Sequence, residues 1–316
     1  MTVLVCSDLD RTLIYSAAAF ALDGPDEAMP RLLCVEFYRG APLSYMTEAA
    51  ARTIDALATA AAFVPATTRT PEQYRRVHLL EKPAGYAITA NGGHLLVDGE
   101  DDPDWAAAVR ARIAGGSAPL ADVQRHLTGV TGDFVLKRRT ASDLFAYTVV
   151  DRAALPPAWV EDLTGWCAER GWRTSLQGRK VYCLPAGLTK AAAAAEVARR
   201  TGASTTLAAG DSLLDTELLE AADLSIRPAH GELHDTRWTS PTTTVTAARG
   251  ITAGQEIAAW LLERATAPHT GHREKSPPRA PGRRQTTPPG GSQRRPSGAT
   301  ITVDPPPAHE EDTLNT

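Results

Sequence analysis

The chain has 316 residues, of which 43% are hydrophobic and 22% are charged, so it can bury one large core or a core with a smaller companion domain. Its net charge of −4 combines −6 over residues 1–268 with a small basic excess beyond them. This acidic balance argues against a nucleic-acid partner, which would require clustered Lys and Arg, and favours a small-molecule substrate.

Short apolar runs alternate with amphipathic or Ala-rich stretches through residues 1–268, a pattern typical of a parallel sheet with crossover helices. The predicted strands cover 3–7, 62–67, 205–209 and 224–227, and the predicted helices cover 47–59, 71–80, 190–200, 216–222 and 254–264. The run AITANGGHLLV places Asn91 and Gly92 between two apolar strands, which predicts a hairpin. The fold class expected from these elements is a doubly wound, Rossmann-like α/β core.

Between this hairpin and Lys190 the order of elements changes to helices followed by pairs of strands. The predicted helices cover 104–114, 119–127 and 158–171, and the predicted strands cover 134–138, 144–150, 172–177 and 179–185. This order is typical of a small α+β domain inserted into a larger one. We predict a core made of residues 1–93 and 186–268, and an inserted domain of residues 94–185.

Residues 269–316 are rich in Pro, Gly, Arg, Ser and Thr and contain no aromatic residue. Such a segment buries too little apolar surface to offset its ordering entropy, so we predict a disordered tail. Its basic part, 273–295, precedes an acidic end around Glu310. The two parts can attract each other, or the tail can bind an unknown protein partner.

The cysteines and the amino terminus indicate the compartment. Cys6, Cys34, Cys167 and Cys183 are far apart and form no CxxC pair, which predicts buried thiols and neither a zinc site nor a disulfide framework. The amino terminus has no basic segment, and no stretch approaches the ~18 apolar residues of a membrane span. We expect a cytoplasmic protein with no membrane partner.

The clearest chemical signal is VLVCSDLDRTL, in which an apolar strand runs into Asp8 and Asp10. In an open parallel sheet the ligand lies beyond the carboxyl ends of the strands, where these two carboxylates would stand. One carboxylate can attack a phosphate ester, and a second can donate a proton to the leaving group and later accept one from water. Two anions beside an anionic substrate require a cation, and Mg²⁺ prefers oxygen ligands.

Three further segments carry suitable chemistry. In GDSLLDTELL, Asp211 and Asp215 follow a strand near the start of a helix, where negative charge is favoured and a metal shell could be completed. Lys190 begins another predicted helix. Its flexible, positively charged side chain can pair with the nucleophile and with a phosphoryl group during transfer. In FVPATTRT a strand ends in hydroxyls that can bind phosphate oxygens.

Together and in this order, these segments resemble the haloacid dehalogenase superfamily of aspartate-nucleophile phosphatases over residues 1–265. The resemblance implies that Asp8 is the nucleophile and Asp10 the acid/base, with Thr67 and Lys190 as the second and third motifs. The implied Mg²⁺ ligands are Asp8, Asp10, Asp211 and Asp215. The inserted domain is similar to the αβ cap of the Cof-like branch, which includes sucrose-phosphate, trehalose-phosphate and mannosyl-3-phosphoglycerate phosphatases.

Substrate contacts are predicted for Thr68, Arg69 and Asn91 in the core and for Arg179 in the cap. The cap also carries Arg138, Arg139 and Lys180 at the ends of its strands, and these residues can reach a substrate if the strands face the core. The branch implies a small phosphorylated metabolite, a sugar or related polyol.

The chain departs from the family in three places. Thr68 stands where Gly is common, and Leu214 stands where Asn usually precedes the last Asp, which removes a possible hydrogen bond near the metal. An extra segment over residues 17–44 separates the first motif from its helix, and its run LLCVEFYRG predicts a flap-like hairpin near the site entrance.

Two other functions stay open at this point. A phosphomutase of the same superfamily would return the phosphoryl group to a sugar instead of giving it to water. A catalytically silent module would keep the fold for regulation or binding. The presence of both Asp8 and Asp10 favours an enzyme, because a silent module has no chemical need for the second carboxylate.

Overall fold

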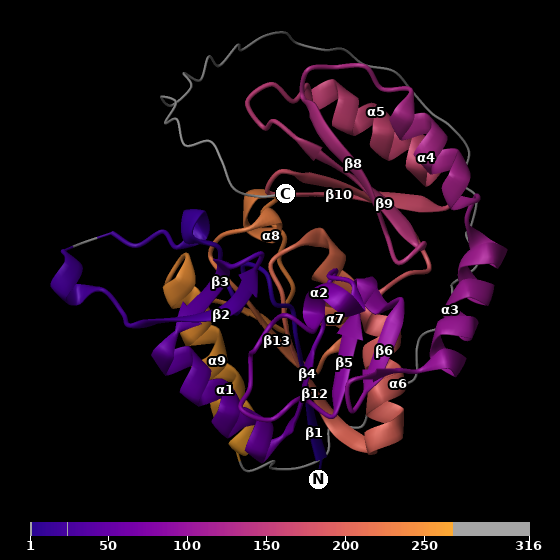
Figure 1. Ribbon diagram of the computed structural model, residues 1–316. Helices are drawn as coiled ribbons and strands as arrows, with labels where there is room; N and C mark the ends of the chain where they lie inside the picture. The colour runs from indigo at the N-terminus through magenta and orange to yellow at the C-terminus, as the bar shows by residue number, and fades with distance from the viewer. Residues whose placement is uncertain (1, 24, 268–316) are drawn as a thin grey trace, which may run out of the picture. The chain divides into compact units, whose positions relative to one another are not determined.

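The computed structural model describes residues 2–23 and 25–267. A five-stranded sheet with the order β14-β13-β12-β1-β4 forms the centre of the core (Figure 1). Each pair of neighbours in it is parallel. In the order of the sheet, the strands are Thr243–Val245, Leu224–Arg227, Ala203–Ala209, Thr2–Ser7 and Ala62–Pro65. This architecture confirms the predicted doubly wound α/β core.

The side chains of β1 alternate between two hydrophobic clusters, one on each face of the sheet. Val3 and Val5 belong to the cluster that includes residues of α1 (Glu48–Ala60) and α9 (Ile251–Thr266). Leu4 and Cys6 belong to the other cluster, which includes residues of α6 (Lys190–Thr201) and α7 (Thr216–Ala221). A strand covered on both faces must be apolar at every position, which is why VLVC shows no alternation.

The start of α6 is fixed by a side-chain cap. The Thr189 hydroxyl accepts a hydrogen bond from the backbone N–H of Ala192, and the helix ends at Gly202 in a left-handed conformation. This cap makes Lys190 the first residue of the helix. The helix packs beside β12 and β1, so its first turn lies near the carboxyl ends of both strands.

A second, antiparallel sheet with the order β10-β11-β9-β8 forms the cap. In the order of the sheet, its strands are Trp172–Gln177, Lys180–Pro185, Phe145–Val150 and Val135–Ala141. Two helices, α4 (Leu120–Thr128) and α5 (Pro157–Ala168), cover one face of this sheet (Figure 1). Helix α3 (Pro103–Gly116) leads from the core into the cap. The exact boundaries at 93/94 and 185/186 stay a prediction.

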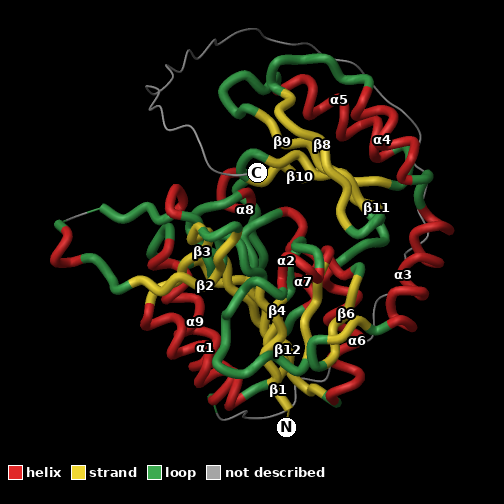
Figure 2. Tube along the Cα trace, in the orientation of Figure 1, coloured by secondary structure: helices red, strands yellow, loops and turns green. Residues whose placement is uncertain are grey.

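Smaller elements surround the carboxyl edge of the core sheet. The hairpin of β2 (Leu32–Tyr38) and β3 (Ala41–Thr47) follows two short 3-10 helices, Ala17–Ala19 and Asp26–Ala28. Strands β5 (Tyr86–Thr89), β6 (His94–Val97) and β7 (Glu100–Asp101) form a third sheet, and the predicted Asn91-Gly92 hairpin joins β5 to β6 through η3 (Ala90–Gly92). Helix α8 (Glu232–Asp235) and η4 (Leu213–Asp215) complete the edge. Figure 2 shows that loops join these elements at the edge facing the cap.

The helix predicted over 71–80 is wrong beyond its first turn. Helix α2 covers only Pro71–Tyr74. The following residues run beside β2 instead, because the N–H of His78 donates to the carbonyl of Val35 at 2.7 Å and Val77 forms a bridge with Glu36. Contacts with a distant strand therefore override the local helical pattern.

No helix in the described ranges combines the length and the apolar character needed to cross a membrane. The predicted tail of residues 269–316 lies outside the described residues.

Candidate active site

Three of the four predicted metal ligands meet at the carboxyl edge of the core sheet. Asp8 follows β1, and Asp211 and Asp215 follow β12. These two strands pair in parallel with Ser7 opposite Ala209, so the residues after them converge. Carboxylate oxygens of the three residues lie within 4.8 Å of one another, and all three side chains are buried. We refer to Asp8, Asp211 and Asp215 as the carboxylate cluster.

Lys190 lies inside this cluster. Its Nζ donates to Asp8 Oδ1 at 2.5 Å and to Asp215 Oδ1 at 2.6 Å, and the side chain is 1% exposed. Burial alone would lower the pKa of Lys190, but Asp215 and Asp8 outweigh burial and raise it. Lys190 is therefore a charged partner for the predicted nucleophile, and its place at the first turn of α6 is what delivers it there.

One lysine does not neutralise the cluster. Burial raises the pKa of Asp8 to about 7, against the opposing effect of Lys190, and the neighbouring carboxylates Asp215 and Asp10 raise it further. The pKa of Asp211 is also held well above its usual value, first by burial and then by the charges of Asp8 and Asp215. Arg11, whose Nε lies 3.5 Å from Asp211 Oδ2, opposes this increase but does not cancel it. The cluster thus carries uncompensated negative charge that a cation would relieve.

The three carboxylates differ in how many donors they already have. Asp215 Oδ2 accepts hydrogen bonds from the backbone N–H groups of Asp211 and Ser212 and from the Ser212 hydroxyl, while its Oδ1 accepts from Lys190. Asp8 Oδ2 accepts only a 3.3 Å bond from the Thr12 hydroxyl among the described residues. Oxygen donors of this kind suit a hard cation such as Mg²⁺. These carboxylate oxygens therefore fit the predicted metal. Asp8 and Asp211 accept fewer hydrogen bonds than Asp215, so their oxygens are the more available ligands.

Asp10 is the predicted ligand that does not join the cluster. Its Oδ1 and Oδ2 accept hydrogen bonds from Arg69 Nη2 and Nε, each at 2.7 Å. Burial would raise the pKa of Asp10, but the Arg69 guanidinium outweighs burial and lowers it. Asp10 is consequently ionised and fixed in orientation by a two-point contact.

The guanidinium of Arg69 is held in turn by the hairpin β2–β3. Arg69 Nη1 donates to Glu36 Oε2 at 2.8 Å, and the Ser44 hydroxyl donates to the same oxygen at 2.7 Å. Arg76 Nε contacts the other Glu36 oxygen at 3.3 Å. Glu36 is fully buried. The sequence predicted a hairpin here but missed Glu36 and Ser44, for which an acidic residue inside the apolar run LLCVEFY was the available signal.

Thr67, Thr68 and Asn91 follow β4 and β5. Thr67 is fully buried, and its hydroxyl accepts a 3.2 Å hydrogen bond from the N–H of Arg69. Thr68 is partly exposed. Asn91 is fully buried, donates its N–H to the carbonyl of Thr67 at 2.9 Å and its Nδ2 to the carbonyl of Leu188 at 2.8 Å. It therefore ties the second motif to the segment that leads into Lys190, and its predicted substrate contact stays a prediction.

The basic residues of the cap occupy different surroundings. Arg138 donates to the carbonyls of Leu127 and Val130, at the end of α4. Arg179 is exposed in the turn between β10 and β11, and its substrate contact stays a prediction. The side chain of Lys180 is exposed, and its pKa is raised, first by Tyr182 and then by Asp10. Of these three residues, Lys180 is the one within electrostatic range of the core carboxylates.

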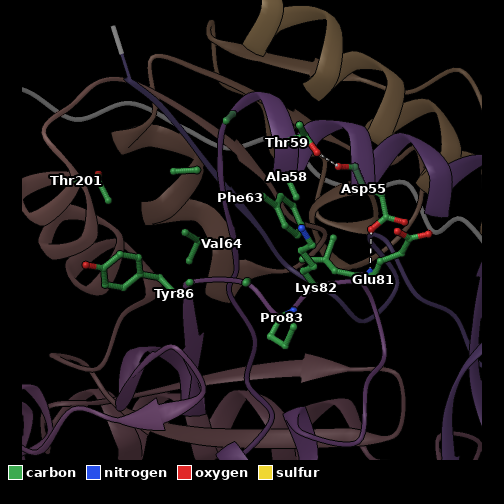
Figure 3. Close-up of a pocket in the computed structure, with 15 residues that line it drawn as sticks. Asp55, Ala58, Thr59, Phe63, Val64, Glu81, Lys82, Pro83, Tyr86 and Thr201 are labelled. Atoms are coloured by element: carbon green, nitrogen blue, oxygen red, sulfur yellow. Dashed lines mark hydrogen bonds between the residues drawn. The ribbon is translucent and has the colours of Figure 1, made fainter.

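Two other positions bear on the site. Leu214, where the family usually has Asn, is buried in the hydrophobic cluster that includes α6 and α7, so an apolar contact replaces the polar one. A cavity of about 490 Å³ lies elsewhere, where β4 and β5 begin (Figure 3). It is lined by Asp55, Phe63 and Tyr86 among others and contains none of the predicted catalytic residues.

The fold and the site together define an α/β protein whose buried carboxylates and lysine lie at the edge of a parallel sheet facing an inserted cap. No protein-family model matches the chain, and no curated protein is similar to it in sequence. Many solved structures are similar to the chain, among them the following two. The sucrose-phosphatase of a Synechocystis species, solved with sucrose and phosphate, has 19% sequence identity and a TM-score of 0.58 over 83% of this chain and 98% of that one. A protein of Thermoplasma acidophilum has 14% identity and a TM-score of 0.54, with the same coverage.

The chain accordingly has the same fold as the sucrose-phosphatase, inserted cap included, and this agrees with the fold implied by the resemblance seen in the sequence. At these identities the similarity establishes the fold. The reaction has to be argued from the residues of this chain.

Proposed function

We propose that this protein is a magnesium-dependent hydrolase of phosphate monoesters. The observation that supports it best is the contact of Lys190 with Asp8 inside the buried carboxylate cluster. A carboxylate that is buried, paired with a lysine and placed at the carboxyl edge of a parallel sheet is suited to attack a phosphorus atom. The substrate proposed from the fold is a small phosphorylated sugar or polyol, and a cytoplasmic location stays a prediction.

The reaction would proceed in two displacements at phosphorus. Lys190 holds Oδ1 of Asp8, and Oδ2, which accepts a 3.3 Å hydrogen bond from the Thr12 hydroxyl, forms the new bond to phosphorus while the ester oxygen departs with a proton from Asp10. Water then attacks the aspartyl phosphate and gives its proton to Asp10, which releases inorganic phosphate and restores Asp8. Mg²⁺, bound by Asp8 and Asp211 beside Asp215, would neutralise the charge of the phosphoryl oxygens.

The contact with Arg69 favours the role of Asp10 as a base over its role as an acid. With both oxygens bound to Arg69, Asp10 is ionised and ready to act as the base in the second displacement. The first displacement requires a protonated acid. Substrate binding must therefore free one Asp10 oxygen from Arg69, and that oxygen must take up a proton from solvent before Asp10 can protonate the leaving group.

Phosphate release from a panel of monoesters by the purified full chain, with Mg²⁺ and with EDTA, tests this proposal. We expect release from an aryl phosphate and from several sugar phosphates that depends on added Mg²⁺ and is absent in Asp8→Asn. No turnover of any ester would favour the silent module instead. Transfer of phosphate between sugars without net release would favour the phosphomutase.

A further inference from the structure

One face of the cap sheet is directed toward the core. Strands β10 and β11 pair with Ser175 opposite Tyr182 and Gln177 opposite Lys180, and residues directly opposite in an antiparallel pair have side chains on the same face. The Ser175 hydroxyl donates to Glu232 Oε2 of the core at 2.7 Å. Arg173, two positions before Ser175, donates to Glu217 Oε2 of the core at 2.8 Å. The face that carries Ser175 therefore also directs Tyr182 and Lys180 to the core side.

The register extends this face across the next two strands. Tyr182 is opposite Tyr147 in β9, and Tyr147 is opposite Arg139 in β8. The rings of Tyr147 and Tyr182 are 5.3 Å apart, and Lys180 Nζ lies 5.7 Å from the centre of the Tyr147 ring. We call Lys180, Arg139, Tyr147 and Tyr182 the cap face.

The opposite side of the sheet is already occupied. Val181 and Cys183, which alternate with Lys180 and Tyr182, are 0% exposed and lie in the cluster that includes Cys167 of α5. Tyr182 is buried in the same cluster, so the accessible members of the cap face are Lys180, Arg139 and the partly exposed Tyr147. The cap face is thus the side of these strands that remains for a ligand bound between the cap and the carboxylate cluster.

The cap face is basic and aromatic. The register places three basic residues, Lys137, Arg139 and Lys180, on this face, and strands β8, β9 and β11 contain no acidic residue. Arg138 lies on the opposite face, where it bonds to carbonyls at the end of α4.

Lys180 is exposed to solvent on the face that the strand register directs toward the core, with its Nζ 5.7 Å from the centre of the Tyr147 ring. Asp10 contributes to its raised pKa. A neutral sugar is recognised through hydroxyls that need acceptors as well as donors, and carboxylates are the strongest acceptors. Strands β8, β9 and β11 offer cations and ring surfaces on this face without a carboxylate of their own, and the core carboxylates Glu217 and Glu232 are already bound at β10.

We infer that the cap face selects phosphate monoesters that carry a second anionic group, such as a carboxylate, at a distance from the phosphate. Lys180 binds that group, Arg139 adds positive charge beside it, and the Tyr147 ring packs against the carbon skeleton between the two anions. This inference rests on the proposed phosphatase activity and specifies its substrate class within the phosphorylated sugars and polyols.

The test compares esters that differ in one carboxylate. The pairs are 6-phosphogluconate with sorbitol 6-phosphate, and 3-phosphoglycerate with glycerol 3-phosphate, each assayed with the full chain and Mg²⁺. We expect kcat/KM for the carboxylated member to be higher by about tenfold or more, the usual effect of one hydrogen bond to a charged group. Lys180→Met should reduce this ratio to near one, because its loss of kcat/KM falls mainly on the carboxylated member.

Arg125→Met is the matched control, because Arg125 lies on α4 at the covered side of the cap sheet and pairs only with Asp122 among the described residues. It removes the same charge from the cap and should leave the ratio unchanged. An equal loss for both members in Lys180→Met would mean that Lys180 acts on the catalytic carboxylates, and the inference would be wrong. Equal rates for both members in the wild type would also overturn it. Failure to hydrolyse any ester, aryl phosphate included, would instead reject the proposed function.

Discussion

Both carboxylate oxygens of Asp10 are bound by the guanidinium of Arg69, each at 2.7 Å, and the same guanidinium is bound by the buried Glu36 at 2.8 Å. A hairpin inserted after the first motif thus reaches the predicted acid/base through one arginine. Glu36 fixes Arg69, and Arg69 fixes Asp10. The orientation of Asp10 therefore depends on a segment that lies far from the carboxylate cluster in the sequence.

Arg69→Lys should impair the protonation of the leaving group. Lysine keeps a positive charge for Glu36 but cannot make the two-point contact with Asp10. We expect kcat/KM for an alkyl phosphate to fall on the order of 10²-fold, the effect of a misplaced catalytic group. The loss for an aryl phosphate should be smaller, because its leaving group needs little protonation. Arg76→Lys is the control, since Arg76 contacts Glu36 but not Asp10. Equal losses for both esters would contradict this role of Arg69.

Asp8→Asn should abolish turnover without weakening the fold. The amide keeps the shape of the side chain but removes the nucleophile, so we expect kcat to fall at least about 10³-fold. It also removes one negative charge from a buried cluster in which Lys190 retains Asp215 as a partner. The melting temperature of the metal-free variant should therefore equal or exceed that of the wild type. Scanning calorimetry and a phosphate-release assay measure both effects, and a folded variant that still turned over would rule out Asp8 as the nucleophile.

Gly92→Ala should destabilise the protein and displace Lys190. Gly92 has a φ of +94°, and a Cβ there would overlap the carbonyl oxygen of Thr189, the residue that caps α6. Gly99 has a similar φ of +87° with no atom near its missing Cβ, so Gly99→Ala measures the backbone strain alone. We expect Gly92→Ala to lose about 1–3 kcal/mol more free energy of unfolding than Gly99→Ala, together with most of the activity. Urea unfolding curves that coincide for the two variants would contradict this close approach.

His230 should make stability fall in weak acid. Its Nδ1 accepts from the N–H of Gly250, so Nε2 carries the proton and donates to the carbonyl of Arg11 at 2.9 Å. Burial lowers the pKa of His230 to about 4. The unfolded chain, with a His pKa of about 6.5, binds the proton first as the pH falls. The contribution of His230 is therefore complete above pH ~6.5 and is lost as the pH falls toward 4.

His230→Gln removes this proton linkage and keeps a donor for Arg11. Between pH ~6 and ~5 we expect the free energy of unfolding of the wild type to fall by up to about 1 kcal/mol per pH unit more steeply than that of the variant. Urea titrations at several pH values measure the two slopes. Parallel curves would mean that His230 is not held neutral in the folded protein.

The order and type of the main elements follow from the sequence alone. The strand over 224–227 and the start of α6 at Lys190 agree with the prediction, because buried apolar runs and a Thr cap act within a few residues. The convergence of Asp8 with Asp211 and Asp215 was also predictable, since residues that follow parallel strands meet at one edge of the sheet.

Contacts between distant segments were decided only by the tertiary structure. The helix predicted beyond Tyr74 is replaced by an extended segment because β2 supplies a better partner for its backbone. The clamp of Glu36 on Arg69 joins residues 33 positions apart, and the pairing register of the cap strands turns Lys180 toward the core. Local sequence specifies which residues can ionise or form a strand. Which of them become partners depends on how the strands pair and on which buried charges must be neutralised, and only the folded chain determines both.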